Sequence, residues 1–265
     1  ILEATDERHR HTLLATSLFH DFTADDAVAI SGHADAPEVL DDLCRRNLFT
    51  YRKSSVGQHY QYHALFREFL EHRLRAQVNA SDLEALQRRA AALSETEGRP
   101  DNALELYCAS ADWDAAARVI LAAAPTLLAQ GRWKTLRDWV GALPAEYVPR
   151  HPWLLYGLGS ARMQEDRKAA RDIFIEAFDG FAASGVAVGQ MLCAAAVIRT
   201  YHFEYNTFEP MDRWVAEIDR LLETGPQFPT AAAQLAVWSA LLLAFTYRLP
   251  GHRLRAAAIE RVTHL

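Results

Sequence analysis

The sequence contains few of the residues that interrupt helices. Its 265 residues include 12 glycines and 10 prolines, against 46 alanines. Alanine has the highest helix propensity, and glycine and proline have the lowest, so this composition favours a large helical protein. Half of the residues are hydrophobic and 23% are charged. These fractions exclude the disordered and collagen-like classes.

Cysteines are also few and widely separated. Cys44, Cys108 and Cys193 are odd in number and form no C-x-x-C pair, so they cannot make a complete disulfide framework. This usage predicts a reducing, cytoplasmic setting. No hydrophobic run reaches the roughly 18 residues of a membrane span, so we expect no membrane partner. The formal net charge of −6 argues against a basic nucleic-acid footprint over the whole chain.

The motifs of common enzymes are missing. The sequence contains no G-x-S-x-G, no H-E-x-x-H and no phosphate-binding G-x-x-x-x-G-K-[ST]. His9 and His11 are close enough to hold a metal weakly, but two such residues are more simply incidental. We therefore expect no catalytic residues, no metal and no bound cofactor in this chain, and no enzyme activity.

Residues 1–76 predict a winged-helix domain. Three helical segments come first, over residues 12–18, 23–30 and 36–44. Thr23 provides a cap for the second of them, and acidic residues fill its first turn. Two strand-like segments, 48–52 and 59–63, flank a polar turn at 53–58, which is typical of a hairpin. A helix follows, whose apolar face runs from Leu65 to Leu74.

Residues 77–265 repeat a pattern of helix, short turn and helix. Ala170, Phe174 and Ala177 place two small residues around an aromatic at tetratricopeptide-like spacing. The same i, i+4, i+7 stripe begins again at Trp214 and at Ala258, about 40 residues apart each time. Such a period predicts stacked helix pairs in a right-handed superhelix, incomplete at its C-terminal end, whose groove binds a partner. An ordinary helical bundle is the simpler alternative. The predicted fold class is therefore mainly α.

Four stretches resemble the MalT-like regulators, which are large, LuxR-type, ATP-dependent bacterial transcriptional activators of the signal-transduction ATPase class. The stretches are Leu43–Phe49, Tyr60–Leu70, Ala111–Arg118 and Leu127–Pro144. The first two resemble the winged helix of that family, and the other two resemble the helical region that follows it. The resemblance covers roughly residues 10–165, and it continues to residue 265 as repeat character only.

The resemblance implies a four-part protein, with an ATPase domain, a winged helix, a superhelical sensor and a C-terminal helix-turn-helix. The first and last parts have no counterpart in this sequence. We therefore expect a middle fragment, with the winged helix over 1–76 and the start of the sensor over 77–265. ATP or ADP is implied for the parent protein only, and DNA contact only through the helix-turn-helix.

His63 is the candidate nucleotide contact. The stretch Tyr62–Leu70 resembles the winged-helix histidine motif of apoptotic and plant-resistance ATPases, in which the histidine contacts the β-phosphate of ADP. A histidine at a helix start can donate to phosphate beside the amides of the helix N-terminus. The alternative is a histidine bonded to the local backbone at a strand–helix junction.

The segment from residue 43 to 75 is locally basic. The resemblance implies that Arg45, Arg46 and Arg67 dock the winged helix onto the ATPase domain of the parent. Two alternatives stay open for these side chains: contact with DNA phosphates, and plain solvated charge.

A third set of residues lies near a helix end, over 199–206, and on the first helices of neighbouring helix pairs. If these helices line the concave face, their aromatic and polar side chains suit a sugar, a small signal or an extended peptide. The alternative is that they pack between helices. The candidate effector-binding residues are Tyr156, Arg162, Arg199, Tyr201, His202, Tyr205, Trp238 and Tyr247.

These observations predict a regulatory segment of a transcriptional activator. A small-molecule inducer or an effector protein would bind the superhelix, and the winged helix would relay the signal to the ATPase domain. A freestanding tetratricopeptide-like adaptor is the rival hypothesis, and direct DNA binding by the winged helix is a third.

Overall fold

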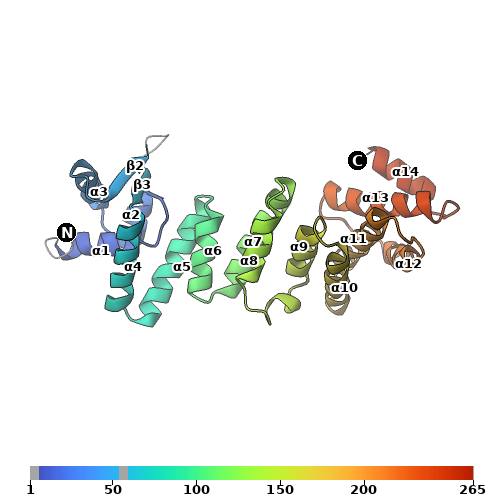
Figure 1. The fold of residues 1–265 in the computed structure, drawn as a ribbon, viewed down its shortest axis with the longest axis horizontal. Coiled ribbons are helices and arrows are strands. Elements are labelled where there is room, and N and C mark those ends of the chain that lie inside the picture. The colour runs from blue at the N-terminus through green and yellow to red at the C-terminus, as the bar shows by residue number, and fades with distance from the viewer. Residues whose placement is uncertain (1–5, 54–58, 265) are drawn as a thin grey trace. The chain divides into compact units, whose positions relative to one another are not determined.

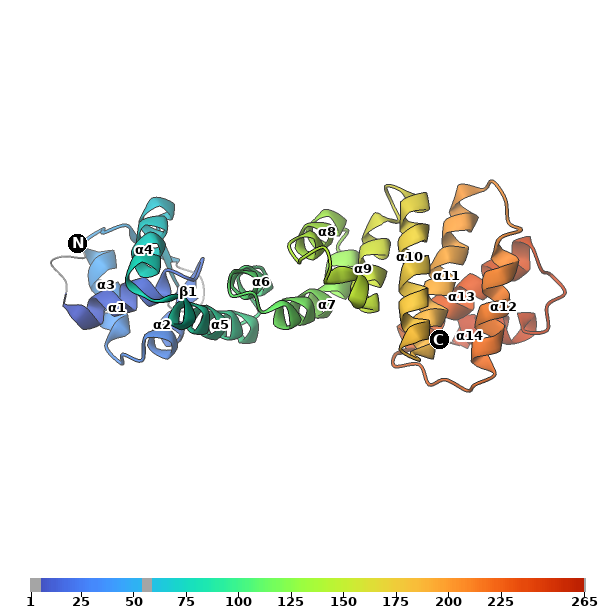
Figure 2. The ribbon, with the colours of Figure 1, turned by 90° about the horizontal axis from the view of Figure 1, so that it is seen from below.

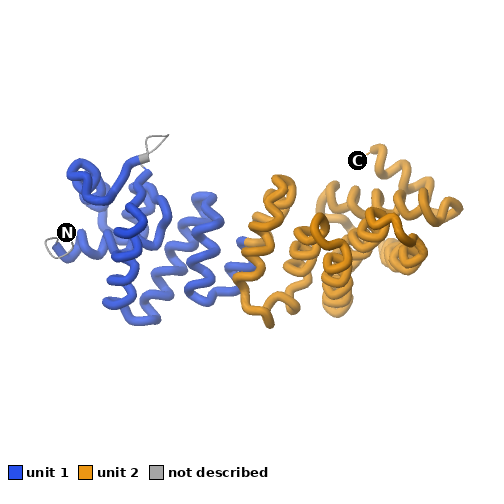
Figure 3. The backbone as a smooth tube through the Cα atoms, viewed as in Figure 1, with its two compact units in different colours: residues 1–119 blue, residues 120–265 orange. Residues whose placement is uncertain are grey.

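The computed structural model describes residues 6–53 and 59–264. Clustering of contacts divides the chain into two compact units, residues 1–119 and 120–265 (Figure 3). The predicted mainly α fold is confirmed: helices form almost all of the regular structure, with one small sheet (Figure 1). The predicted turn at 53–58 lies outside the described residues, apart from Lys53.

The first unit begins with a winged helix. Its elements are α1 (Glu7–Thr16), β1 (Phe22–Thr23), α2 (Ala24–Ser31), α3 (Ala36–Arg45), β2 (Thr50–Lys53), β3 (His59–Tyr62) and α4 (Ala64–Gln77). The expected hairpin is present as the antiparallel pair β2–β3, with Thr50 opposite Tyr62. A third strand, which the sequence did not predict, adds β1 to the other edge of β3.

The start of α2 shows why this region folds as the sequence predicts. Thr23 caps the helix, and its hydroxyl accepts a hydrogen bond from the backbone N–H of Asp26. The Asp26 carboxylate accepts in return from the backbone N–H of Thr23, which completes a capping box. Gly32 ends the helix at a φ of 74°, a conformation that glycine adopts without strain.

A helix pair, α5 (Ala80–Thr96) and α6 (Pro100–Ala109), is bonded to the winged helix within the same compact unit. Arg99 pairs with Asp26 at 2.8 Å, and the Asn102 amide donates to the Leu18 carbonyl at 3.1 Å. His20 and Glu105 form a further ion pair at 2.7 Å. These bonds join segments more than 70 residues apart. Compactness and domain homology are different criteria, so the predicted boundary after residue 76 stays a prediction.

Helix α7 (Trp113–Ala129) crosses the division between the units, and the second unit continues as helix pairs. Its elements are α8 (Trp133–Gly141), the 3-10 turn η2 (Val148–Arg150), α9 (Pro152–Arg162), α10 (Arg167–Ala183), α11 (Ala187–Glu204), α12 (Met211–Leu222), α13 (Ala231–Tyr247) and α14 (Arg255–His264). Helix α11 packs against α10, α12 and α13 (Figure 2). This central position explains why its residues from Gly189 to Ile198 are all buried.

The repeat stripes lie in the core of the second unit. Ala170, Phe174 and Ala177 are fully buried, and so is Ile218 between Trp214 and Leu221. The stripe at Ala258 is buried at its first residue only, and its last residue, Leu265, lies outside the described part of the chain. The i, i+4, i+7 spacing therefore marks core positions, as expected for stacked helix pairs.

Gly189 is required by a close approach between α11 and Phe181. A Cβ atom at residue 189 would lie 2.5 Å from the Phe181 ring, which is itself held edge-on by Trp153 at 4.7 Å. We expect Gly189→Ala to lower the free energy of unfolding by about 1–3 kcal/mol, because the added methyl overpacks the core. Chemical denaturation measures this change.

Gly157→Ala is the matched control. Gly157 also lies within a helix, but a Cβ atom at residue 157 would have none of the described side chains within 4 Å. This substitution should raise the free energy of unfolding by up to about 1 kcal/mol, because alanine favours the helix. Equal effects at the two glycines would contradict the packing explanation.

Candidate functional site

His63 lies at the junction of β3 and α4, where it caps the helix. The Nδ1 atom of its ring accepts a hydrogen bond from the backbone N–H of Leu65 at 3.4 Å. The backbone N–H of His63 donates to the Phe49 carbonyl at 2.8 Å. The local backbone bond that the sequence left open is therefore present. Because Nδ1 acts as an acceptor, the neutral imidazole carries its proton on Nε2, which can still donate to an oxygen.

The surroundings of His63 are aromatic and exposed. The ring centroids of Phe49 and Tyr51 lie 6.3 and 6.5 Å from that of His63, and more than half of each of the two side chains is exposed. Leu65 and Phe69 of α4 are also exposed. Exposed apolar side chains in one region mark an interaction surface. This surface fits the predicted docking role of the winged helix, although it consists mainly of rings and not of the arginines.

The three predicted docking arginines are each paired with an acid on their own helix or at its end. Arg45 and Arg46 both contact Asp42, at 3.3 and 3.2 Å, and Arg67 contacts Glu71 at 3.3 Å. Their charge is therefore partly neutralised within the winged helix. The docking role of these residues stays a prediction.

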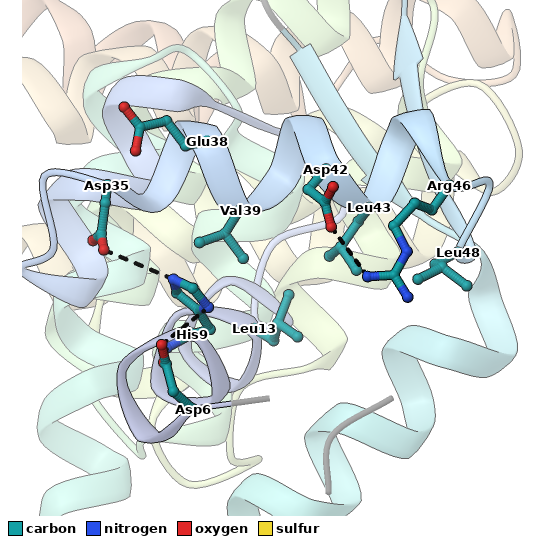
Figure 4. Close-up of a pocket in the computed structure, with 10 residues that line it drawn as sticks. All are labelled: Asp6, His9, Leu13, Asp35, Glu38, Val39, Asp42, Leu43, Arg46 and Leu48. Carbon is teal, nitrogen blue, oxygen red and sulfur yellow. Dashed lines mark hydrogen bonds and ion pairs between the residues drawn. The ribbon is translucent and has the colours of Figure 1, made fainter. Parts of the chain in front are cut away.

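Arg46 also lines a cavity between α1 and α3, of about 590 Å³ (Figure 4). Leu13, Val39 and Leu43 contribute apolar atoms to the cavity. Four carboxylates surround it, and the His9 imidazole lies 3.3 Å from Asp6 and 3.8 Å from Asp35. Three of the four carboxylates thus contact His9 or Arg46 of the same cavity.

Tyr60 of β3 is fully buried, and its hydroxyl donates to Asp41 at 2.6 Å. Burial, and then this hydrogen bond, raise the pKa of Tyr60 to about 12. A phenol in the unfolded chain titrates near pH 10. The folded pKa is the higher one, so the stability from neutral Tyr60 is complete below pH 10 and is lost as the pH rises through about 12.

This titration predicts a pH-dependent effect of Tyr60→Phe. The difference in unfolding free energy between the wild type and this variant should be constant from pH 7 to 9. It should shrink above pH 10, because only the wild type has an ionisable phenol at residue 60. Urea unfolding at each pH measures both curves, and a difference that stays constant to pH 11.5 would contradict the assigned pKa.

In the second unit, five rings gather where α11 and α13 end, and we call them the His202 cluster. Its members are His202, Phe203, Tyr205, Phe208 and Tyr247. The His202 centroid lies 4.8 Å from Tyr247 and 5.2 Å from both Phe203 and Tyr205. Phe208 lies 5.6 Å from Tyr247 and 6.2 Å from Tyr205. The structure therefore brings together three predicted effector residues and adds two phenylalanines.

The cluster is open to solvent on its outer side. Phe203, Tyr205 and Tyr247 are 50%, 65% and 47% exposed, whereas His202 is buried beneath them. Tyr205 ends α11 with a φ of 49°, a conformation uncommon for a residue with a side chain. The His202 Nδ1 atom is enclosed and has no hydrogen-bond partner among the described residues. Exposed rings and an unsatisfied nitrogen make the His202 cluster a candidate binding surface.

Tyr201 belongs to a second network, which the sequence analysis did not foresee. The Arg171 guanidinium of α10 lies 3.8 Å above the Tyr201 ring, donates to the Thr200 hydroxyl at 2.9 Å and pairs with Glu204. Arg171 is only 13% exposed in its side chain. It holds the end of α11 against α10, so Tyr201 has a packing role in this unit.

The remaining predicted effector residues lie in different surroundings. Tyr156 of α9 and Arg199 of α11 are both half-buried, and the charge of Arg199 opposes the rise that burial causes in the pKa of Tyr156. Trp238 is buried in the core, which agrees with the alternative that these residues pack between helices. Its Nε1 has no hydrogen-bond partner among the described residues. Arg162 is exposed at the end of α9. The effector-binding role of these residues stays a prediction.

The described part of the chain contains no group of three or more His, Cys, Asp or Glu side chains placed to hold a metal ion. None of its helices combines the length and the apolar composition that crossing a membrane requires.

Residues 1–82 match the family model of the MalT winged helix domain. The chain is also 27% identical over 154 residues to the HTH-type transcriptional regulator MalT of Vibrio parahaemolyticus serotype O3:K6 (strain RIMD 2210633). The aligned part is 58% of this chain and 17% of that relative. The MalT-like character that the sequence predicted is therefore confirmed, for a chain that spans a minor part of its relative.

Proposed function

We propose that this chain is the regulatory segment of a MalT-like transcriptional activator. In this proposal an inducer or an effector protein binds the helix pairs of the second unit, and the winged helix relays the signal to an ATPase domain. One observation carries the proposal: a MalT winged helix domain is followed by helix pairs that hold the exposed His202 cluster. Contiguous exposed rings that are not needed for packing are a feature of binding surfaces.

The proposed mechanism is a shift between two states of the parent protein, one closed with ADP and one open with ATP. An effector favours the open state only by the difference in its affinity for the two states. The Nε2–H of His63 would donate to the β-phosphate in the closed state, and the exposed surface of Phe49, Tyr51 and Leu65 would contact the ATPase domain.

The same proposal assigns no catalytic activity to this chain. ATP or ADP belongs to the parent protein, and DNA contact to a helix-turn-helix of LuxR type outside this sequence. The proposed location is the cytoplasm, where a transcription regulator meets DNA. A freestanding adaptor that binds protein tails is the second candidate, because an exposed aromatic cluster also suits a peptide. DNA binding by the winged helix has less support, since Arg45, Arg46 and Arg67 are paired with acids.

Transcript profiling of the host tests the function. We would compare the wild type, a deletion of the gene, and a variant with Tyr205→Ala and Tyr247→Ala across several carbon and stress conditions. If the chain is a sensor, the transcripts that stop responding to conditions in the deletion strain should also stop responding in the double variant. Ile259→Ala, at an exposed apolar residue of α14, is the matched control and should resemble the wild type.

Two results would count against the proposal. If deletion of the gene changes no transcripts, the regulator hypothesis is wrong and the adaptor hypothesis is favoured. A double tyrosine variant that responds like the wild type in every condition would remove the sensing role of the His202 cluster.

A further inference from the structure

Arg199 of α11 carries a charge that the fold leaves unbalanced. No acid forms an ion pair with it among residues 6–53 and 59–264, and its Nε atom is enclosed without a hydrogen-bond partner there. Tyr156, from α9, is near enough for the charge of Arg199 to oppose the rise that burial causes in the pKa of its hydroxyl group. Arg199 is half-buried, so water does not fully replace the missing partner.

A comparison with Arg171 shows how unusual this is. Arg171 lies on α10, the helix before α11, and its side chain is largely buried. Unlike Arg199, it contacts an acid, Glu204, as well as the Thr200 hydroxyl and the Tyr201 ring. Removing a guanidinium from water is costly unless an anion or several acceptors compensate. Arg199 has one neutral hydroxyl instead. A hydrophobic side chain of the same length would therefore suit the fold alone better than arginine does.

The surroundings of the Tyr156 ring are apolar. Burial raises the pKa of Tyr156, and the nearby charge of Arg199 opposes that rise. The Tyr156 ring packs 5.7 Å from Phe174 and 6.2 Å from Trp153. A guanidinium beside a phenol hydroxyl in such surroundings presents several N–H donors and one O–H to an incoming acceptor.

We propose that Arg199 and Tyr156 bind an oxyanion, a carboxylate or a phosphate, which is the charged group of the effector. Guanidinium binds both groups through paired N–H···O bonds. Phe203 lies one turn beyond Arg199 on the same face of α11 and is half exposed, so the body of the ligand would lie on an aromatic ring. The ligand class is thus a small organic acid or phosphate ester with an apolar or aromatic body. This inference rests on the proposed function.

Thermal unfolding of the full 265-residue chain with four probes tests the site. The probes are phenylacetate, phenyl phosphate, inorganic phosphate and the neutral phenylacetamide, in a buffer of low ionic strength. We expect phenylacetate or phenyl phosphate to raise the Tm by several degrees near saturation, in a manner that added salt weakens. The amide should give no shift. Comparing the shift with phenylacetate to the shift with phenyl phosphate shows whether the site prefers a carboxylate or a phosphate.

Three variants separate binding from structure. Arg199→Met should raise the Tm measured without a probe, because it removes an unpaired charge, and should abolish the response to the oxyanion probes. Arg171→Met should lower the Tm, because it leaves Glu204 without its partner. Arg167→Met, at an exposed arginine of α10, should change neither the Tm nor the response.

Several outcomes would overturn the proposal. These are the absence of a shift with every oxyanion probe, an equal shift in Arg199→Met, and a Tm without a probe that falls as far in Arg199→Met as in Arg171→Met. The result is independent of the transcript experiment. If the chain binds an oxyanion but the transcript experiment shows no regulation, the Arg199 site is confirmed and only its proposed regulatory role is wrong.

Discussion

Arg99→Ala is expected to lower the free energy of unfolding by about 3–5 kcal/mol, because it leaves a buried carboxylate without its cation. Asp26 is 3% exposed, and Arg99 contacts it at 2.8 Å. The guanidinium also bonds to the Asp21 carbonyl and lies 5.4 Å from the centre of the Phe19 ring. One substitution thus weakens the attachment of α6 and the capping box of α2 together. Urea unfolding measures the effect.

Arg118→Ala is the control for this prediction. Arg118 pairs with Glu95 in the same unit, but its side chain is 56% exposed. Solvent screens such a pair, so its loss should cost less than about 1 kcal/mol. Adding Asp26→Asn to Arg99→Ala should recover part of the stability, since the uncompensated charge is then gone. A loss at Arg99 no larger than at Arg118 would show that the attachment is weak.

Phe174→Ala is expected to be equally damaging, at about 3–5 kcal/mol, because it opens a cavity in the core of the second unit. Phe174 is fully buried at the centre of the stripe from Ala170 to Ala177. Its ring lies so close to Gly159 that a Cβ atom there would be 2.8 Å away. The neighbouring backbone is therefore already in contact and can close only part of the space. Tryptophan fluorescence during urea unfolding follows this unit.

Phe203→Ala is the comparison for that experiment. Both substitutions remove the same atoms, but half of the Phe203 side chain is exposed. We expect a change of about 0.5 kcal/mol there, as for most surface substitutions. Similar losses at the two positions would mean that the repeat stripe is not the core of the unit.

Local patterns in the sequence predicted much of the fold. The cap at Thr23, the polar turn between the two strand-like segments and the i, i+4, i+7 stripes all depend on neighbours within a few residues. For this reason the winged helix and the helix pairs followed from periodicity and turn residues. Strand β1 did not, because two residues paired to a distant strand leave no periodic signal.

The attachment of α5 and α6 to the winged helix was missed for a related reason. Arg99 and Asp26 are 73 residues apart, and nothing near either residue identifies the other. Arg171 was missed in the same way, since its partners Thr200 and Glu204 lie on the next helix. A single sequence contains the residues of such pairs but not the pairing.

The candidate site was predicted in part. Aromatic and polar residues near the end of one helix drew attention to Tyr201, His202 and Tyr205, and two of these three lie in the His202 cluster. Tyr247 joins them because α11 and α13 pack side by side. Trp238 lies on the same helix as Tyr247 but faces the core. Which face of a helix is buried depends on its neighbours in space, so residue type alone could not separate these two.

The relay that we propose through the winged helix is tested most directly by the nucleotide content of the proposed parent protein. Full-length protein would be purified as wild type, His63→Ala and His63→Asn, and its ADP and ATP contents measured. Asparagine keeps a helix cap and removes the imidazole, so it separates the loss of Nε2 from the loss of the cap. The account predicts that both variants retain less ADP than the wild type. ADP retention equal to that of the wild type in both variants would contradict it.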